Sequence, residues 1–151
     1  MKVVIIDDEP LARSLVKEYL EPHTDLEVVE ECDNGLQGLK AIQQHKPDLI
    51  FLDVQMPRIN GFEMLELVEE PPAVIFTTAF DEYALKAFDA HAVDYLLKPF
   101  TQERFDKAIK LNPVVLGSAG HRDGTLIHHL RAATETPLSQ SIIQAFADAV
   151  Q

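Results

Sequence analysis

The sequence has few of the residues that build disulfides, metal cages or membrane spans. Its 151 residues include one cysteine, Cys32, so an intrachain disulfide is impossible and a structural zinc site would need mainly histidine ligands. We predict a buried core thiol at this position. No apolar run approaches the roughly 18 residues that span a membrane, and the N-terminal apolar stretch is too short for a signal peptide. These absences predict a cytoplasmic protein without a membrane partner.

Basic residues are also scarce. Lysine and arginine number 13 against 25 acidic residues, which gives a formal net charge of -12. Such a chain repels a phosphate backbone, so we expect it not to bind nucleic acid by itself. The content of 46% hydrophobic and 25% charged residues is that of an ordinary globular protein, and the length suits one domain with an appendage.

Short apolar runs recur about every 20–25 residues, the spacing of βαβ units rather than hairpins. The runs are continuous instead of alternating, which is typical of strands covered on both faces in a parallel sheet. The sequence therefore predicts an α/β fold with strands near residues 3–6, 26–29, 49–52, 74–76 and 93–97.

Helical periodicity fills the intervals between these runs. Pro10 suits a first helical position, and Thr101 is the expected N-cap of the last helix. The regularity ends at Pro113, so we predict a domain over residues 1–112 and a linker and tail over 113–151, with one helix near 139–150. The predicted helices of the domain span residues 10–22, 36–44, 62–68, 82–88 and 102–112.

Polar side chains stand where four of the five predicted strands end. In a doubly wound sheet all parallel strands end at one edge, where ligands bind. The first strand is followed by Asp7 and Asp8, the third by Asp53, the fourth by Thr78 and the fifth by Lys98. We expect three carboxylates, a hydroxyl and an ammonium to converge.

Each of these residues has a simpler interpretation on its own. Acids at a helix N-terminus complement the helix dipole, and the other residue types suit turns, strands or a solvated surface. Their joint placement instead predicts a reactive site. Three crowded carboxylates repel one another unless a cation lies among them, and Mg²⁺ prefers an all-oxygen site. With Mg²⁺ and Lys98 offsetting the charge, one carboxylate can attack an incoming phosphoryl group while Thr78 donates to its oxygens.

These strand ends resemble the receiver domains of two-component response regulators. The resemblance covers residues 1 to about 110 and implies a flavodoxin-like, doubly wound five-stranded parallel sheet of order 2-1-3-4-5. It also implies a phosphoacceptor with at most autophosphatase activity, not an enzyme. The matching segments are Ile6-Asp7-Asp8-Glu9-Pro10, Leu52-Asp53-Val54-Gln55-Met56-Pro57 with Gly61, Thr77-Thr78-Ala79 and Tyr95-Leu96-Leu97-Lys98-Pro99-Phe100.

The resemblance also assigns roles around the phosphoryl group. It implies that Asp53 accepts this group from a sensor histidine kinase, and that Asp8, Asp53 and the backbone carbonyl of Gln55 bind Mg²⁺. Asp7 would hold a metal-bound water. Lys98 would pair with Asp53 and the phosphoryl group, with a cis peptide bond before Pro99.

A switch is implied as well. Phosphorylation would draw Thr78 toward the phosphoryl oxygens and let Tyr95 rotate, changing the face of the fourth helix, fifth strand and fifth helix and so controlling dimerisation or an output partner. In the alternative interpretation, Tyr95 is a core aromatic with its hydroxyl at the surface. Phe80, Tyr83 and Phe88 are either interface anchors or core residues.

A finer likeness links the chain to receivers of the LytTR transcription-factor family, in which a β-rich DNA-binding domain follows the receiver. Residues 113–151 are too short for such a domain and contain only Arg122 and Arg131 as permanent cations, so we expect a LytTR-type receiver without its DNA-binding domain. A single-domain regulator or phosphorelay shuttle is the alternative. The segments carrying this likeness are Asp8-Glu9-Pro10-Leu11-Ala12-Arg13 and Thr78-Ala79-Phe80-Asp81-Glu82-Tyr83-Ala84-Leu85.

Two alternative functions have less support in the sequence. A haloacid-dehalogenase-like phosphatase also uses an aspartyl nucleophile and Mg²⁺, but its pattern resembles Asp-x-Asp on the first strand, whereas here the acids are adjacent and Asp53 follows the third strand. A pseudo-receiver that is never phosphorylated would not need all five chemical positions, which are intact.

Overall fold

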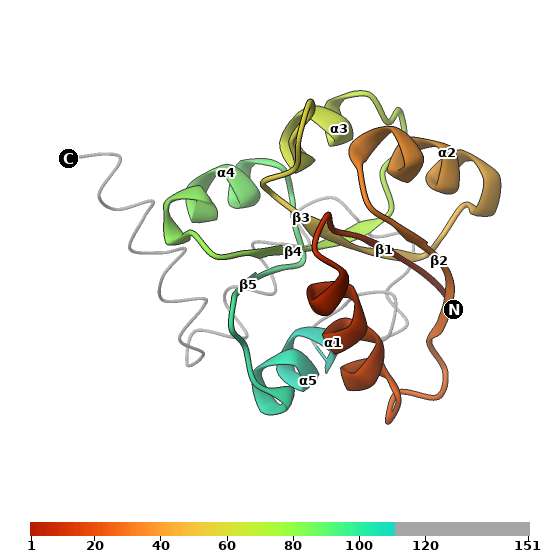
Figure 1. Ribbon diagram of the computed structural model, residues 1–151, viewed down its shortest axis with the longest axis vertical. Helices are drawn as coiled ribbons and strands as arrows, with labels where there is room; N and C mark the ends of the chain where they lie inside the picture. Colours follow the sequence, from red (N-terminus) through yellow and green to blue (C-terminus); the bar gives the residue numbers. More distant parts are fainter. Residues whose placement is uncertain (111–151) are drawn as a thin grey trace.

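The computed structural model describes residues 1–110 as an alternation of strands and helices (Figure 1). The predicted boundary at residue 112 and the predicted helix near 139–150 lie outside the described residues. In chain order the elements are β1 (Lys2–Ile6), α1 (Pro10–Leu20), β2 (Glu27–Cys32), α2 (Gly35–His45), β3 (Leu49–Asp53), α3 (Gly61–Glu66), β4 (Ala73–Thr78), the 3₁₀ turn η1 (Asp81–Tyr83), α4 (Ala84–Asp89), β5 (Asp94–Leu97) and α5 (Gln102–Lys110).

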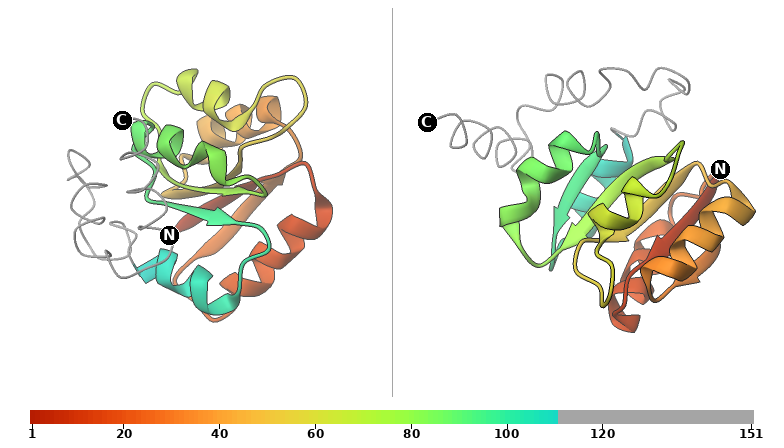
Figure 2. Two further views of the ribbon diagram at one scale, coloured as in Figure 1. Left: turned by 90° about the vertical axis from the view of Figure 1, so that its left-hand side faces the viewer. Right: turned by 90° about the horizontal axis from the view of Figure 1, so that it is seen from above.

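The strands form one five-stranded parallel sheet of order β2-β1-β3-β4-β5, which confirms the predicted fold. Helices α1 and α5 cover one face, and α2, α3 and α4 cover the other (Figures 1 and 2). None of the helices in the described part of the chain has the length and apolarity needed for a membrane crossing.

The two faces of the sheet contribute to separate hydrophobic cores. Ile5 and Phe51 point toward α1 and α5, where Phe51 stacks on Phe105 with ring centroids 5.2 Å apart. On the other face Phe76 packs against Phe62 of α3 at 4.7 Å. Because β3 is central and buried along its whole length, its continuous apolar run follows directly from its position.

The boundaries of β2 differ from the prediction. The strand was expected at residues 26–29 but continues to Cys32, through Glu30 and Glu31. It lies at the edge of the sheet, where side chains are only partly covered, so acidic residues occupy strand positions that the apolar run does not mark. Cys32 itself is buried, as predicted, and burial raises the pKa of its thiol to about 12.

Side-chain caps define several helix starts. Thr101 accepts a hydrogen bond from the backbone N–H of Arg104 at 3.1 Å, which confirms the predicted N-cap of α5. Asn60 caps α3 in a reciprocal capping box with Glu63 that the sequence analysis did not identify. The third helix ends at residue 66 instead of 68, and the fourth begins with a 3₁₀ turn instead of a regular α-turn.

Gly61 lets the loop after β3 fold back against the strand end. Its N–H donates to the carbonyl of Val54 at 2.9 Å, and a Cβ at this position would lie 2.5 Å from the carbonyl oxygen of Asp53. That neighbour is backbone and cannot rotate away. The absence of a side chain at residue 61 therefore fixes the path of the loop beside Asp53.

Gly61→Ala is expected to destabilise the domain by about 1–3 kcal/mol, the usual cost of overpacking, measured by urea unfolding. Gly38→Ala is the control, because the atoms nearest to its Cβ would be side-chain atoms of Ile6 and Met64 instead of backbone, and alanine favours the helix. An equal loss in both variants would contradict the role of the backbone contact.

Candidate functional site

Four acids gather at the carboxyl edge of the sheet. Asp7, Asp8 and Glu9 follow β1, and Asp53 is the last residue of β3. One carboxylate oxygen of each lies within 4.8 Å of the others. Asp7 and Asp53 are buried, whereas Asp8 and Glu9 are exposed. The predicted convergence of the three aspartates is confirmed, and Glu9 joins them although the sequence analysis gave it no role in the site.

Lys98 is the cation of this cluster. It follows β5, and its peptide bond to Pro99 is cis, as predicted. The ammonium lies 2.9 Å from Asp7 Oδ2, 3.1 Å from Glu9 Oε1 and 3.8 Å from Asp53 Oδ2. Lys98 therefore contacts all the acids except Asp8, and it pairs more closely with Asp7 and Glu9 than with Asp53.

The environment of Asp53 favours its protonated form. Burial is the main cause and the charge of Asp7 adds to it, while Lys98 opposes both, and together they raise the pKa of Asp53 to about 8. The backbone N–H of Gln55 donates to Asp53 Oδ1 at 3.3 Å and stabilises the ionised form slightly. Ionised Asp53 consequently needs more positive charge than Lys98 alone supplies.

Thr78 and Tyr95 meet at the backbone of Phe80. Thr78 ends β4, and its Oγ1 accepts a hydrogen bond from the N–H of Phe80 at 3.3 Å. Tyr95 is fully buried, and its hydroxyl donates to the carbonyl oxygen of Phe80. Tyr95 is therefore a core aromatic, as the alternative interpretation had it, but its hydroxyl is enclosed against a backbone acceptor instead of lying at the surface. Burial also raises the pKa of Tyr95.

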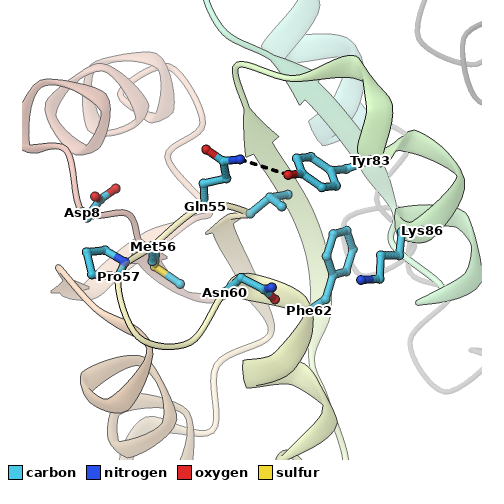
Figure 3. A pocket seen from close by; sticks show the side chains of 9 residues that line it. Asp8, Gln55, Met56, Pro57, Asn60, Phe62, Tyr83 and Lys86 are labelled. Atoms are coloured by element: carbon cyan, nitrogen blue, oxygen red, sulfur yellow. Dashed lines mark hydrogen bonds between the residues drawn. The ribbon is translucent and has the colours of Figure 1, made fainter.

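A pocket of about 430 Å³ lies beside the acidic cluster, between the loop after β3 and helices α3 and α4 (Figure 3). The side chain of Gln55 lies at the rim of this pocket, and the Gln55 Nε2 donates a hydrogen bond to the hydroxyl of Tyr83 at 2.9 Å. From the sequence, Gln55 was expected to act through its backbone carbonyl only. Of the three aromatics considered as interface anchors, Phe80 is 43% exposed, while Tyr83 and Phe88 pack against the core.

Residues 3–110, nearly all of the described part, match the family "Response regulator receiver domain". The chain belongs to this family. The transcriptional regulatory protein BtsR of Escherichia coli K12 is 50% identical over 111 residues, which are 72% of this chain and 46% of that protein. An uncharacterized response regulatory protein of Vibrio cholerae is 46% identical over 112 residues, 73% of this chain and 47% of that protein. The chain thus spans about half the length of the curated relatives it matches.

Solved structures support the same family assignment. The response regulatory domain of MrkE from Klebsiella pneumoniae superposes with a TM-score of 0.71 and 33% identity, covering 78% of this chain and 99% of that one. The receiver domain of AraT from Geobacillus stearothermophilus superposes with a TM-score of 0.70 and 30% identity, covering 78% of this chain and 95% of that one. The chain is therefore the receiver domain of a two-component response regulator, a family of signalling proteins and not of conventional enzymes.

The pKa of Asp53 predicts how the stability of the metal-free domain depends on pH. Between its ordinary value of 3.8 and about 8, the folded state keeps a proton that the unfolded chain has lost. The stability from this group is therefore complete below 3.8 and is lost as the pH rises to about 8.

Asp53→Asn avoids this loss, so its stability relative to the wild type is expected to increase steadily from about pH 5 to pH 8 in EDTA, measured by urea unfolding. Asp25→Asn, which changes an exposed carboxyl outside the cluster, is the control. A difference between Asp53→Asn and the wild type that stays constant with pH would contradict the raised pKa.

Proposed function

We propose that this receiver is a phosphorylation switch in which Asp53 accepts a phosphoryl group from a sensor histidine kinase in the presence of Mg²⁺. The observation that carries the proposal is the position of Asp53, a buried carboxylate among three other acids with one ammonium 3.8 Å away. Simple helix capping does not account for this grouping, because α1 has no side-chain cap bond from Glu9.

The residues present fit a magnesium ion. All the candidate ligands are hard oxygens, and the cluster carries four carboxylates against the single ammonium of Lys98. Asp8, Asp53 and the backbone carbonyl of Gln55 are the proposed ligands, and Asp7 is proposed to hold a metal-bound water. When bound, the ion supplies positive charge that ionises Asp53 and offsets the phosphoryl oxygens.

In the proposed reaction, an ionised oxygen of Asp53 attacks phosphorus as the bond from phosphorus to the histidine nitrogen breaks, and the electron pair leaves with the imidazole. Lys98 already lies within reach of Asp53 and pairs with the incoming phosphoryl oxygens. Thr78 gives up its contact with Phe80 and turns its hydroxyl toward them. Hydrolysis of the aspartyl phosphate returns the site to its resting state, so autophosphatase activity is the only catalytic activity that the switch needs.

The proposed output is a change of the face made by α4, β5 and α5. Thr78 and Tyr95 both bind the backbone of Phe80, so a movement of Thr78 toward a phosphoryl group would remove one of the contacts that hold this segment. Tyr95 lies on β5 and Phe80 directly precedes η1 and α4. A rearrangement there would alter the surface that supports dimerisation or binds an output partner.

We further propose that the receiver belongs to a LytTR-type transcriptional regulator. The BtsR relatives are named transcriptional regulatory proteins and are about twice as long as the matched region. A homodimer formed on phosphorylation suits such a regulator. A single-domain regulator or phosphorelay shuttle would instead stay monomeric when activated.

Incubation with acetyl phosphate and Mg²⁺ is expected to add one phosphoryl group per chain, detected by intact-mass analysis, and Asp53→Asn is expected to add none. Asp8→Asn should need more Mg²⁺ for the same yield, because one ligand charge is lost. An equal adduct on Asp53→Asn would refute the assignment. Steady release of phosphate from esters by Asp53→Asn would instead favour the phosphatase alternative.

Beryllofluoride, a phosphoryl mimic, is expected to convert the domain into a dimer in light scattering. Thr78→Ala should weaken this dimerisation about fivefold or more, the range of ordinary allosteric coupling, because it removes the hydroxyl that would turn toward the phosphoryl oxygens. Tyr95→Phe should have a similar effect, because it removes the hydroxyl that binds the carbonyl of Phe80. Phenylalanine keeps the buried ring and so avoids a cavity. Dimerisation that is unchanged in both variants would mean that the Phe80 contacts play no part in the output.

A further inference from the structure

The hydrogen bond between Gln55 and Tyr83 joins the phosphorylation loop to α4. Gln55 lies two residues after Asp53, and Tyr83 ends η1 immediately before α4. The two residues are 28 positions apart in sequence, and their side chains meet at 2.9 Å on the rim of the pocket that both line (Figure 3). This bond therefore connects the loop that approaches Asp53 with the helix on the proposed output face.

Both ends of this connection are held in place. The ring of Tyr83 packs against Phe62 with centroids 6.1 Å apart and against Phe80 at 6.2 Å in an edge-to-face contact. Phe62 belongs to the buried core, so the phenol hydroxyl stands at a fixed position. At the other end, the backbone N–H of Gln55 donates to Asp53 Oδ1. Gln55 is thus bound through its backbone and its side chain.

We propose that Tyr83 is a positioning residue for the metal site. By binding the side chain of Gln55, its hydroxyl fixes the orientation of the residue whose backbone carbonyl is the proposed Mg²⁺ ligand. The inference rests on the proposed function, since it concerns the same ion. Gln55 lies between β3 and α3, outside any helix or strand, so without this bond its carbonyl would have to be ordered when the ion binds, which lowers affinity.

The connection acts in both directions. If the Tyr83 hydroxyl strengthens Mg²⁺ binding through Gln55, then by thermodynamic linkage bound Mg²⁺ strengthens the hold on Tyr83. The residues that follow Tyr83 form α4, so the amides of Ala84–Asp89 are expected to exchange more slowly when the ion is bound. This contact with α4 is separate from the contacts of Thr78 and Tyr95 with Phe80.

Tyr83→Phe tests the proposal because it removes the hydroxyl and keeps the ring contacts. Titration of the full chain with MgCl₂, without a phosphodonor and followed by NMR, is expected to show a Kd about two- to fivefold higher, the effect of one partly exposed hydrogen bond. Gln55→Leu keeps the backbone carbonyl and should give the same change. The Kd of the double variant should rise no more than that of either single variant, because all three variants lack the same hydrogen bond.

Tyr19→Phe is the matched control. Its hydroxyl donates to the carbonyl of Phe100 at 3.1 Å, on the face covered by α1 and α5, so it should leave the Kd for Mg²⁺ unchanged. Urea unfolding of both variants separates a loss of global stability from a specific effect on the metal site. Hydrogen exchange of α4 with and without Mg²⁺ gives the second measurement, and the protection by Mg²⁺ should be smaller in Tyr83→Phe.

The possible outcomes are distinct. If the wild type binds Mg²⁺ and Tyr83→Phe binds it equally well, the positioning role is refuted while the proposed metal site stands. Equal protection of α4 by Mg²⁺ in both proteins would refute the linkage between the two ends of the bond. If the wild type does not bind Mg²⁺, the metal site of the proposed function and the role of Tyr83 both fail.

Discussion

The crowding of four acids, two of them buried, at one edge of the sheet is the constraint on which the chemistry of this domain depends. Asp7 and Asp53 are buried, and the ammonium of Lys98 is shared by Asp7, Glu9 and Asp53. Burial raises the pKa of Asp53, the charge of Asp7 adds to this rise and Lys98 offsets only part of it, so the nucleophilic form of Asp53 is disfavoured. Under the proposed function, a divalent cation would offset the remaining negative charge and leave Asp53 ionised and able to accept a phosphoryl group.

The fold imposes this crowding and also limits where its effects can go. All five strands end at the same edge, and their buried faces pack into two cores that tolerate little deformation. Polar contacts link this edge to the output face, where Thr78 and Tyr95 bind Phe80 and Gln55 binds Tyr83. Both sets of contacts end on the segment that leads into α4, so the proposed change at the site would reach the same face by two connections.

Much of this arrangement was predictable from local patterns. Continuous apolar runs indicated a parallel sheet, and the polar residues at the carboxyl ends of β1, β3, β4 and β5 indicated the site. The strand order was available only through the family resemblance. Edge strand β2 was predicted too short, because its acidic residues carry no apolar signal. The reciprocal cap of Asn60 and Glu63 was missed although its spacing is visible in the sequence.

The sequence by itself determined which residues stand at the strand ends, since an apolar run followed by a polar residue is a local pattern. Only the tertiary structure decided how these residues pair. Lys98 lies closest to Asp7 and Glu9 instead of Asp53, the Tyr95 hydroxyl is enclosed, and Gln55 reaches Tyr83. Such contacts join segments far apart in the chain, and their distances depend on sheet twist, helix packing and loop path, none of which a local pattern specifies.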